Sequence, residues 1–74
     1  MKFKENLESF IKILESSPEF RRDKALQKVV EILKNSTSEK ELHNHVPLLR
    51  HITIDSVENQ ETANKLFSFL EPYS

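Results

Sequence analysis

Residues 41–51, ELHNHVPLLRH, hold all three histidines of the chain and are its first candidates for chemistry. Histidine can bind a metal through its imidazole, and it can act as a general acid or base near neutral pH. The letters HNH also spell a nuclease signature, but such a nuclease spreads its histidines and asparagine over a ββα unit. Here the three residues are adjacent on a predicted helix, so we interpret the spelling as a coincidence.

The spacing of the histidines does not favour a metal site. On a helix His43 and His45 point about 200° apart, so they cannot both face one ion. Neither H-x-x-x-H nor H-E-x-x-H is present. His43 shares a face with Glu39, and His51 with Asp55, but these two pairs would have to converge to hold zinc. We therefore expect no metal. We interpret the histidines as partly exposed residues near helix ends, with a pH-sensitive contact as the alternative.

No other residues have the spacing of a catalytic site. The chain has no cysteine and no glycine, so it lacks a thiol nucleophile, a G-x-S-x-G serine turn, a phosphate-cradling loop and a dinucleotide fingerprint. Its carboxylates fall on predicted solvated helix faces, which do not tune a carboxyl group for catalysis. A chain of 74 residues that uses its apolar side chains in a core has few left for a cleft. We expect no enzyme, no cofactor and no small-molecule substrate.

Composition indicates one small all-α domain spanning residues 1–74. Hydrophobic residues are 36% of the chain, charged residues 31%, and the formal net charge is −1, as in a globular rather than a disordered protein. The absence of glycine argues against tight β-hairpin turns. There is no disulfide, no signal-peptide pattern and no apolar stretch long enough for a membrane. We expect a cytoplasmic protein with no membrane contact.

Hydrophobic periodicity predicts a bundle of four helices. Residues Phe3 to Glu15 carry apolar side chains at intervals of three and four and predict the first helix. Ser17 suits the N-cap, and Pro18 the first position, of a second helix that ends near Lys34. The short connection makes these two helices an antiparallel hairpin.

The second half of the chain predicts two more helices. Ser38 and Glu41 have the spacing of a capping box, so a third helix begins just after Ser38. Pro47 disfavours helical geometry at the residue before it, so this helix is expected to be short or kinked there. Asp55 repeats the capping pattern and places the last helix from about Ser56 to Leu70. Three apolar residues that follow Pro47 are expected to point mostly inward: Leu48, Leu49 and Ile52.

Apolar residues outside the main helical stripes are candidates for a protein contact. Ile13 and Ile32 lie off the stripes of their helices, and Phe69 lies beside the predicted core residue Phe67. Tyr73, in the apolar C-terminal segment, could anchor either the fold or a partner. We expect these residues to contact a protein partner or a second copy of the chain. The alternative is that they only lie at the margin of the core.

A short basic stripe is the second candidate surface. Residues 1–36 have a charge balance of +2 and the remainder −3. Arg21, Arg22, Lys24 and Lys28 fall on or near one face of the predicted second helix, where they could meet phosphates, meet an acidic protein surface, or simply face solvent. The predicted third helix begins with acids, which argues against its reading DNA. We expect a protein-interaction module, regulatory or adaptor in role. The alternative is an accessory nucleic-acid binder that uses the stripe on backbone phosphate.

Overall fold

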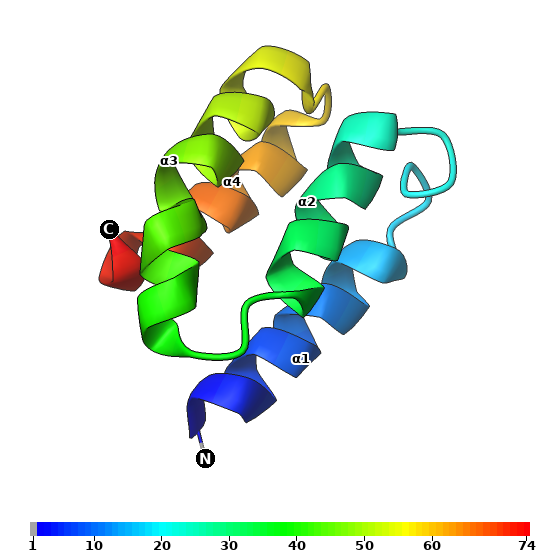
Figure 1. Ribbon diagram of the computed structural model, residues 1–74. Helices are drawn as coiled ribbons and strands as arrows, with labels where there is room; N and C mark the ends of the chain where they lie inside the picture. Colours follow the sequence, from blue (N-terminus) through cyan, green and yellow to red (C-terminus); the bar gives the residue numbers. More distant parts are fainter. Residues whose placement is uncertain (1) are drawn as a thin grey trace.

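The computed structural model of the protein describes residues 2–74. No strand occurs in this range, and the predicted all-α bundle of four helices is confirmed. The elements in chain order are α1 (Lys2–Glu15), α2 (Lys24–Lys34), α3 (Glu39–Ser56), α4 (Gln60–Leu70) and a short 3₁₀ helix, η1 (Glu71–Tyr73) (Figure 1).

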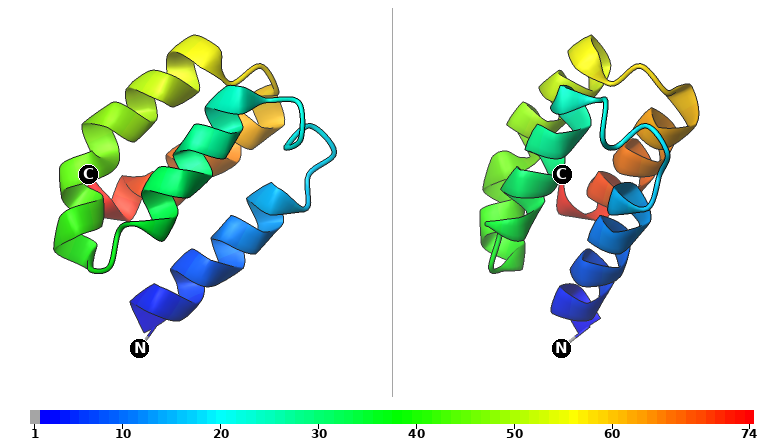
Figure 2. Two further views of the ribbon diagram at one scale, coloured as in Figure 1. Left: turned by 45° about the vertical axis from the view of Figure 1, so that its right-hand side comes forward. Right: turned by 90° about the vertical axis from the view of Figure 1, so that its right-hand side faces the viewer.

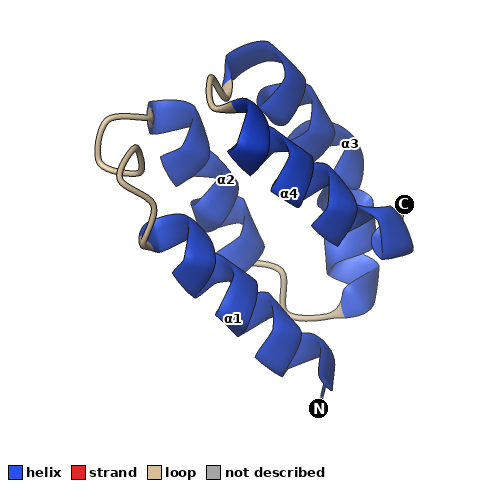
Figure 3. Cartoon of the chain, turned by 180° about the vertical axis from the view of Figure 1, so that it is seen from behind, coloured by secondary structure: helices blue, strands red, loops and turns tan. Residues whose placement is uncertain are grey.

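The four helices form two layers. α2 and α3 make one layer, and α1 and α4 make the other (Figures 2 and 3). Successive helices run antiparallel, as their short connections require. No helix within residues 2–74 is both long and apolar enough to cross a membrane. One core lies between the layers and is made of Leu7, Phe10, Ile11, Leu14, Leu26, Val29, Val30, Leu33, Leu42, Val46, Leu49, Val57, Ala63, Leu66 and Leu70.

The start of α2 differs from the prediction. Ser17 does not cap this helix, because its hydroxyl donates to the carbonyl oxygen of Leu14 at 2.7 Å. Residues 18–22 form turns instead. Asp23 is the N-cap: its backbone is extended (φ −95°, ψ 98°), and its carboxylate accepts from the amide of Leu26 at 3.0 Å. Aspartate and serine cap with similar strength, but Asp23 stands directly before the apolar-periodic run whose side chains pack in the core.

Helix α3 continues through Pro47 and is the longest helix, so the prediction that it is short is wrong. Proline has no amide to bond the carbonyl of His43, and this costs free energy. The helix nevertheless continues because it buries one face on both sides of the proline. Val46 before it and Leu49 after it both lie in the core.

The start of α3 is as predicted. Ser38 is the N-cap, and its hydroxyl accepts from the amide of Glu41 at 3.2 Å. Glu41 does not bond back to Ser38. Its carboxylate accepts from the hydroxyl of Thr37 at 2.8 Å and from the Thr37 amide at 3.3 Å. These bonds, the hydroxyl first, lower the pKa of Glu41 below its ordinary value.

The last helix also starts later than predicted. Ser56 is the final residue of α3 rather than the first of α4. Asp55 does not cap α4, since its carboxylate lies 2.9 Å from Nε2 of His51 on the same helix. Asn59 is the N-cap, and its side-chain oxygen accepts from the amide of Thr62 at 3.2 Å. The prediction failed because α3 continues past Pro47 and includes Asp55 and Ser56, which were expected to cap and begin the last helix.

Candidate functional site

The histidines make hydrogen bonds within the fold. Nδ1 of His43 donates to the carbonyl oxygen of Tyr73 at 2.6 Å and fastens η1 to α3. Nδ1 of His45 lies 2.9 Å from Oγ of Ser36, which donates its own hydrogen to the carbonyl of Ile32. His45 is therefore the donor to Ser36. The third histidine pairs with an aspartate of its own helix. Within residues 2–74, no three side chains of metal-binding type are grouped to hold an ion.

Three of the four predicted protein-contact residues lie together. Ile13 of α1, Phe69 of α4 and Tyr73 of η1 line a hollow of about 350 Å³, and Ile13 and Phe69 also line a second hollow of about 550 Å³. We call these two hollows the α1–α4 furrow. Ile32 lies elsewhere, on α2, and packs against the core.

Aromatic packing already covers much of the apolar surface of the α1–α4 furrow. Phe69 stacks on Phe10, with ring centroids 4.2 Å apart and planes inclined by 7°. Tyr73 lies with its ring centroid 5.7 Å from Phe3 and 5.7 Å from Phe69. Ile13, at 52% exposed, is the apolar side chain that remains largely open there. In the α1–α4 furrow a partner could therefore cover one largely exposed apolar side chain, Ile13, but no broad apolar surface.

A larger groove of about 1090 Å³ opens between α2 and α3. It lies where the N-terminal end of α2 and the C-terminal half of α3 reach the same end of the molecule, beside the connection of residues 16–23 (Figure 1). Its apolar lining is Pro18 from the connection, Ala25 from α2, and Leu48 and Ile52 from α3. We call it the α2–α3 groove.

Leu48 is the most exposed of the apolar lining residues that the two helices contribute. It is 48% exposed, whereas Ile52, one turn further along α3, is half-buried against the core. The prediction that Leu48 points inward is wrong. Because α3 stays helical through Pro47, Leu48 is turned by about 100° from its buried neighbour Leu49 and reaches the groove instead of the core.

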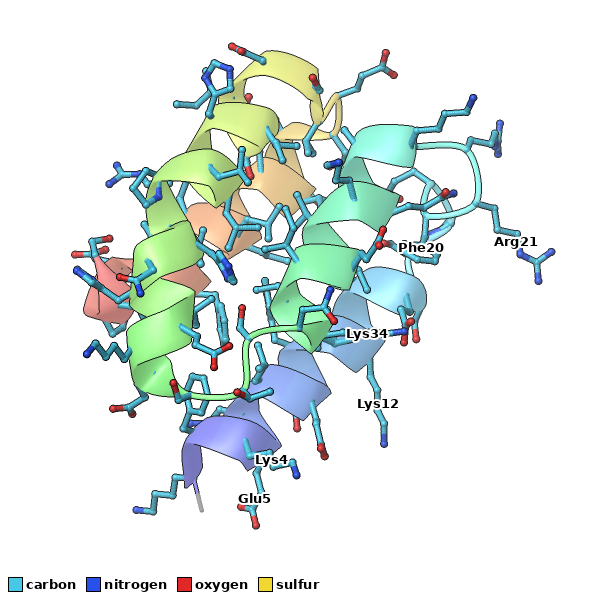
Figure 4. All side chains as sticks on the ribbon, in the orientation of Figure 1. Lys4, Glu5, Lys12, Phe20, Arg21 and Lys34 are labelled. Carbon is cyan, nitrogen blue, oxygen red and sulfur yellow. The ribbon has the colours of Figure 1, made fainter. Side chains whose placement is uncertain are left out.

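The predicted basic residues divide between α2 and the preceding connection. Lys24 and Lys28 lie on α2, but Arg21 and Arg22 belong to the connection, so the stripe is not confined to the helix. Arg22, Lys24 and Lys28 line the α2–α3 groove, while Arg21 is outside the lining and extends into solvent (Figure 4). No ion pair found within residues 2–74 uses any of these four cations.

Three acids also line the α2–α3 groove: Glu19, Asp23 and Glu58. Asp23 is engaged as the cap of α2. Glu19 accepts from the hydroxyl of Thr62 on α4 at 2.6 Å; this bond, a bond from its own amide and nearby Lys65 lower the pKa of Glu19. Glu58 lies in the connection before α4. The groove lining therefore carries three cations and three carboxylates, and its helical stretch on α2, with Lys24 and Lys28, is the part that is basic alone.

Gln27 fixes the connection that carries Arg22. Its Nε2 donates to the carbonyl oxygens of Phe20 at 2.8 Å and Arg21 at 3.1 Å. One amide group thus holds two successive carbonyls of the connection, in addition to its own turn bonds such as that from the Asp23 amide to the Glu19 carbonyl at 2.8 Å. The sequence gives one signal for this role: Gln27 lies one helical turn after Asp23, so it faces the connection once that aspartate is identified as the cap.

Comparisons with protein-family models, with curated proteins and with solved structures found no match for this chain.

Proposed function

We propose that the protein is a non-enzymatic protein-interaction module, regulatory or adaptor in role, that binds its partner in the α2–α3 groove. The observation that carries this proposal is the pair Leu48 and Ile52, which lie one turn apart on α3 and are left partly uncovered in a groove. Covering such side chains removes apolar surface from water, which favours association by about 25 cal/mol for each Å².

The α2–α3 groove has the dimensions of a peptide contact. Its volume of about 1090 Å³ slightly exceeds that of small-molecule pockets, which are typically about 300–1,000 Å³ and more enclosed. Leu48, Ile52 and Ser56 follow one another along α3 and all line it. With a rise of about 1.5 Å per residue they cover roughly 12 Å of helix, the length of a two-turn segment of a partner.

The nucleic-acid alternative has weaker support. A backbone-phosphate site needs several cations that act together. Arg21 lies outside the groove, and Glu19 and Glu58 stand within it, where they would repel phosphates. The apolar lining would also remain uncovered by a phosphate backbone.

Site-specific crosslinking tests the proposal. The photo-crosslinking residue p-benzoylphenylalanine replaces Leu48 in one variant and Ile54 in another. Ile54 is 68% exposed on the same helix but does not line the groove, so it is the matched control. In a nuclease-treated native lysate we expect a discrete protein crosslink from position 48 and not from position 54. Equal crosslinking from both positions, or none from position 48, would overturn the proposal.

The partner is either another protein or a second copy of the chain. Sedimentation velocity at a low and a high concentration distinguishes the two. A second copy gives a sedimentation coefficient that rises with concentration and a crosslinked product of twice the monomer mass.

A further inference from the structure

We propose that the occupant of the α2–α3 groove is an amphipathic helix with two apolar residues one turn apart and acidic residues along one flank. This inference rests on the proposed function, because it names the partner chemistry of the same groove. It is carried by the arrangement of apolar and charged side chains on the two walls of the groove.

The α3 wall sets the apolar spacing. Leu48 and Ile52 are four residues apart, a separation of roughly 6 Å along the helix axis. A partner helix that lies along α3 presents its own i and i+4 side chains at that spacing, which is the helix-in-groove mode of recognition. An extended strand places same-face side chains at about 6.6 Å but exposes its backbone groups, and the groove lining offers no sheet edge to pair them.

The α2 wall sets the charge. Lys24 and Lys28 are also one turn apart, both are exposed, and Arg22 continues the line into the preceding connection. A helix lying between α2 and α3 turns one flank towards these cations. Acids at one-turn spacing on that flank meet Lys24 and Lys28. Lys24 and Lys28 therefore place the acidic flank of the partner against α2.

A designed peptide tests this chemistry directly. It is an alanine-rich helix with two leucines four residues apart and three glutamates along one adjoining flank; its control has glutamines in place of the glutamates. Each peptide is titrated into the ¹⁵N-labelled full chain and followed by NMR. We expect the acidic peptide to shift the amide signals of Ala25, Leu48 and Ile52 saturably. The control should bind about tenfold more weakly, because each partly exposed charge pair contributes up to roughly fivefold in affinity.

Two results of that titration would overturn the inference. One is equal affinity for the acidic and the glutamine peptide. The other is a set of shifted signals confined to the α1–α4 furrow, at Ile13 and Phe69. A twelve-nucleotide single-stranded DNA serves as a third probe. If it shifts the groove amides at lower concentration than the acidic peptide does, the ligand is a phosphate backbone and the inference is wrong.

A charge-swap experiment makes the test specific to α2. The double variant Lys24→Glu/Lys28→Glu should prefer a lysine version of the peptide over the glutamate version. Its fold should be retained, because both side chains are exposed and a glutamate in the first turn of α2 suits the helix dipole. The control Lys4→Glu/Lys12→Glu changes the net charge equally on α1, outside the groove lining (Figure 4). It should keep the preference for glutamate, and reversal by this control as well would refute the α2 contact.

The inference and the proposed function fail in different ways. If the acidic preference is missing but position 48 still crosslinks to a protein, the groove remains a protein site and only the acidic helix is rejected. If position 48 does not crosslink, the interaction function itself is rejected.

Discussion

Single polar residues mainly hold separate segments of this fold together. His43 on α3 binds the carbonyl of Tyr73 in η1, and Glu19 in the first connection binds Thr62 on α4. Each bond joins residues far apart in sequence, so it constrains the chain more than a local turn does. His43, one of the histidines first considered for metal binding or catalysis, thus contributes to tertiary structure.

Thr62→Val tests the bond between the first connection and α4. Valine has nearly the shape of threonine but cannot donate to Glu19. We expect the pKa of Glu19 to rise towards its ordinary value, because the hydroxyl of Thr62 is the main cause of its lowered pKa. Carboxyl titration by NMR measures this change. Glu41, whose pKa is lowered by Thr37, is the internal control and should not move. An unchanged pKa at Glu19 would contradict the assignment.

The same bond makes stability depend on pH. Because folding lowers the pKa of Glu19, its stabilising effect is fully present above the ordinary carboxyl pKa of about 4.3 and is lost as the pH falls through the lowered folded value. The loss of unfolding free energy in Thr62→Val should therefore be larger at pH 7 than at pH 3. Urea denaturation at both pH values measures it. An equal loss at both would show that the hydroxyl acts through uncharged contacts.

At the scale of elements, the periodicity of the sequence predicts all four helices, but not all of their ends. α3 starts after Ser38 as predicted, although Ser36 and Thr37 beside it are also capping residue types. Two separated caps compete at the starts of α2 and α4: Ser17 with Asp23, and Asp55 with Asn59. The later one is used in both cases. Caps differ by less than about 1 kcal/mol, so tertiary packing decides between them, and a single sequence does not show that packing.

Asp23→Ala identifies the cap of α2. Losing an N-cap aspartate costs about 0.5–2 kcal/mol in free energy of unfolding. We expect a loss in this range for Asp23→Ala. The matched change Asp55→Ala removes only an exposed pair with His51 and should cost at most about 0.5 kcal/mol. Urea denaturation compares the two variants. A greater loss for Asp55→Ala would mean that the wrong aspartate has been assigned as a cap.

Pro47→Ala tests the account of α3. Proline in a helix interior lowers the free energy of unfolding by about 3 kcal/mol relative to alanine. Because proline also restricts the unfolded chain, about 0.4–1 kcal/mol of this loss is offset. Pro47 is exposed, so replacing it by alanine removes few packing contacts. We expect the variant to be more stable by about 2 kcal/mol, measured by urea denaturation. Pro72→Ala, in the first turn of η1, should have little effect. A destabilised Pro47→Ala would show that α3 depends on its proline.

At the scale of the whole molecule, the candidate site comes from tertiary arrangement more than from any motif. The sequence predicts Lys24 and Lys28 on one helical face because they are four residues apart. It does not predict that Leu48 and Ile52 face them across a groove. That depends on α3 continuing past Pro47 and on how α2 and α3 pack, and both depend on contacts between residues distant in sequence.

Affinity capture with two matched variants tests the interaction claim most directly. Leu48→Asp places a charge in the α2–α3 groove, and Ile54→Asp places one on the same helix outside it. Both positions are exposed, so circular dichroism should show unchanged helicity. In a nuclease-treated native lysate, we expect the wild type and Ile54→Asp to retain the same stoichiometric protein and Leu48→Asp to lose it. If Leu48→Asp retains that protein, or if nuclease removes it from the wild type, the α2–α3 groove is not a protein-binding site.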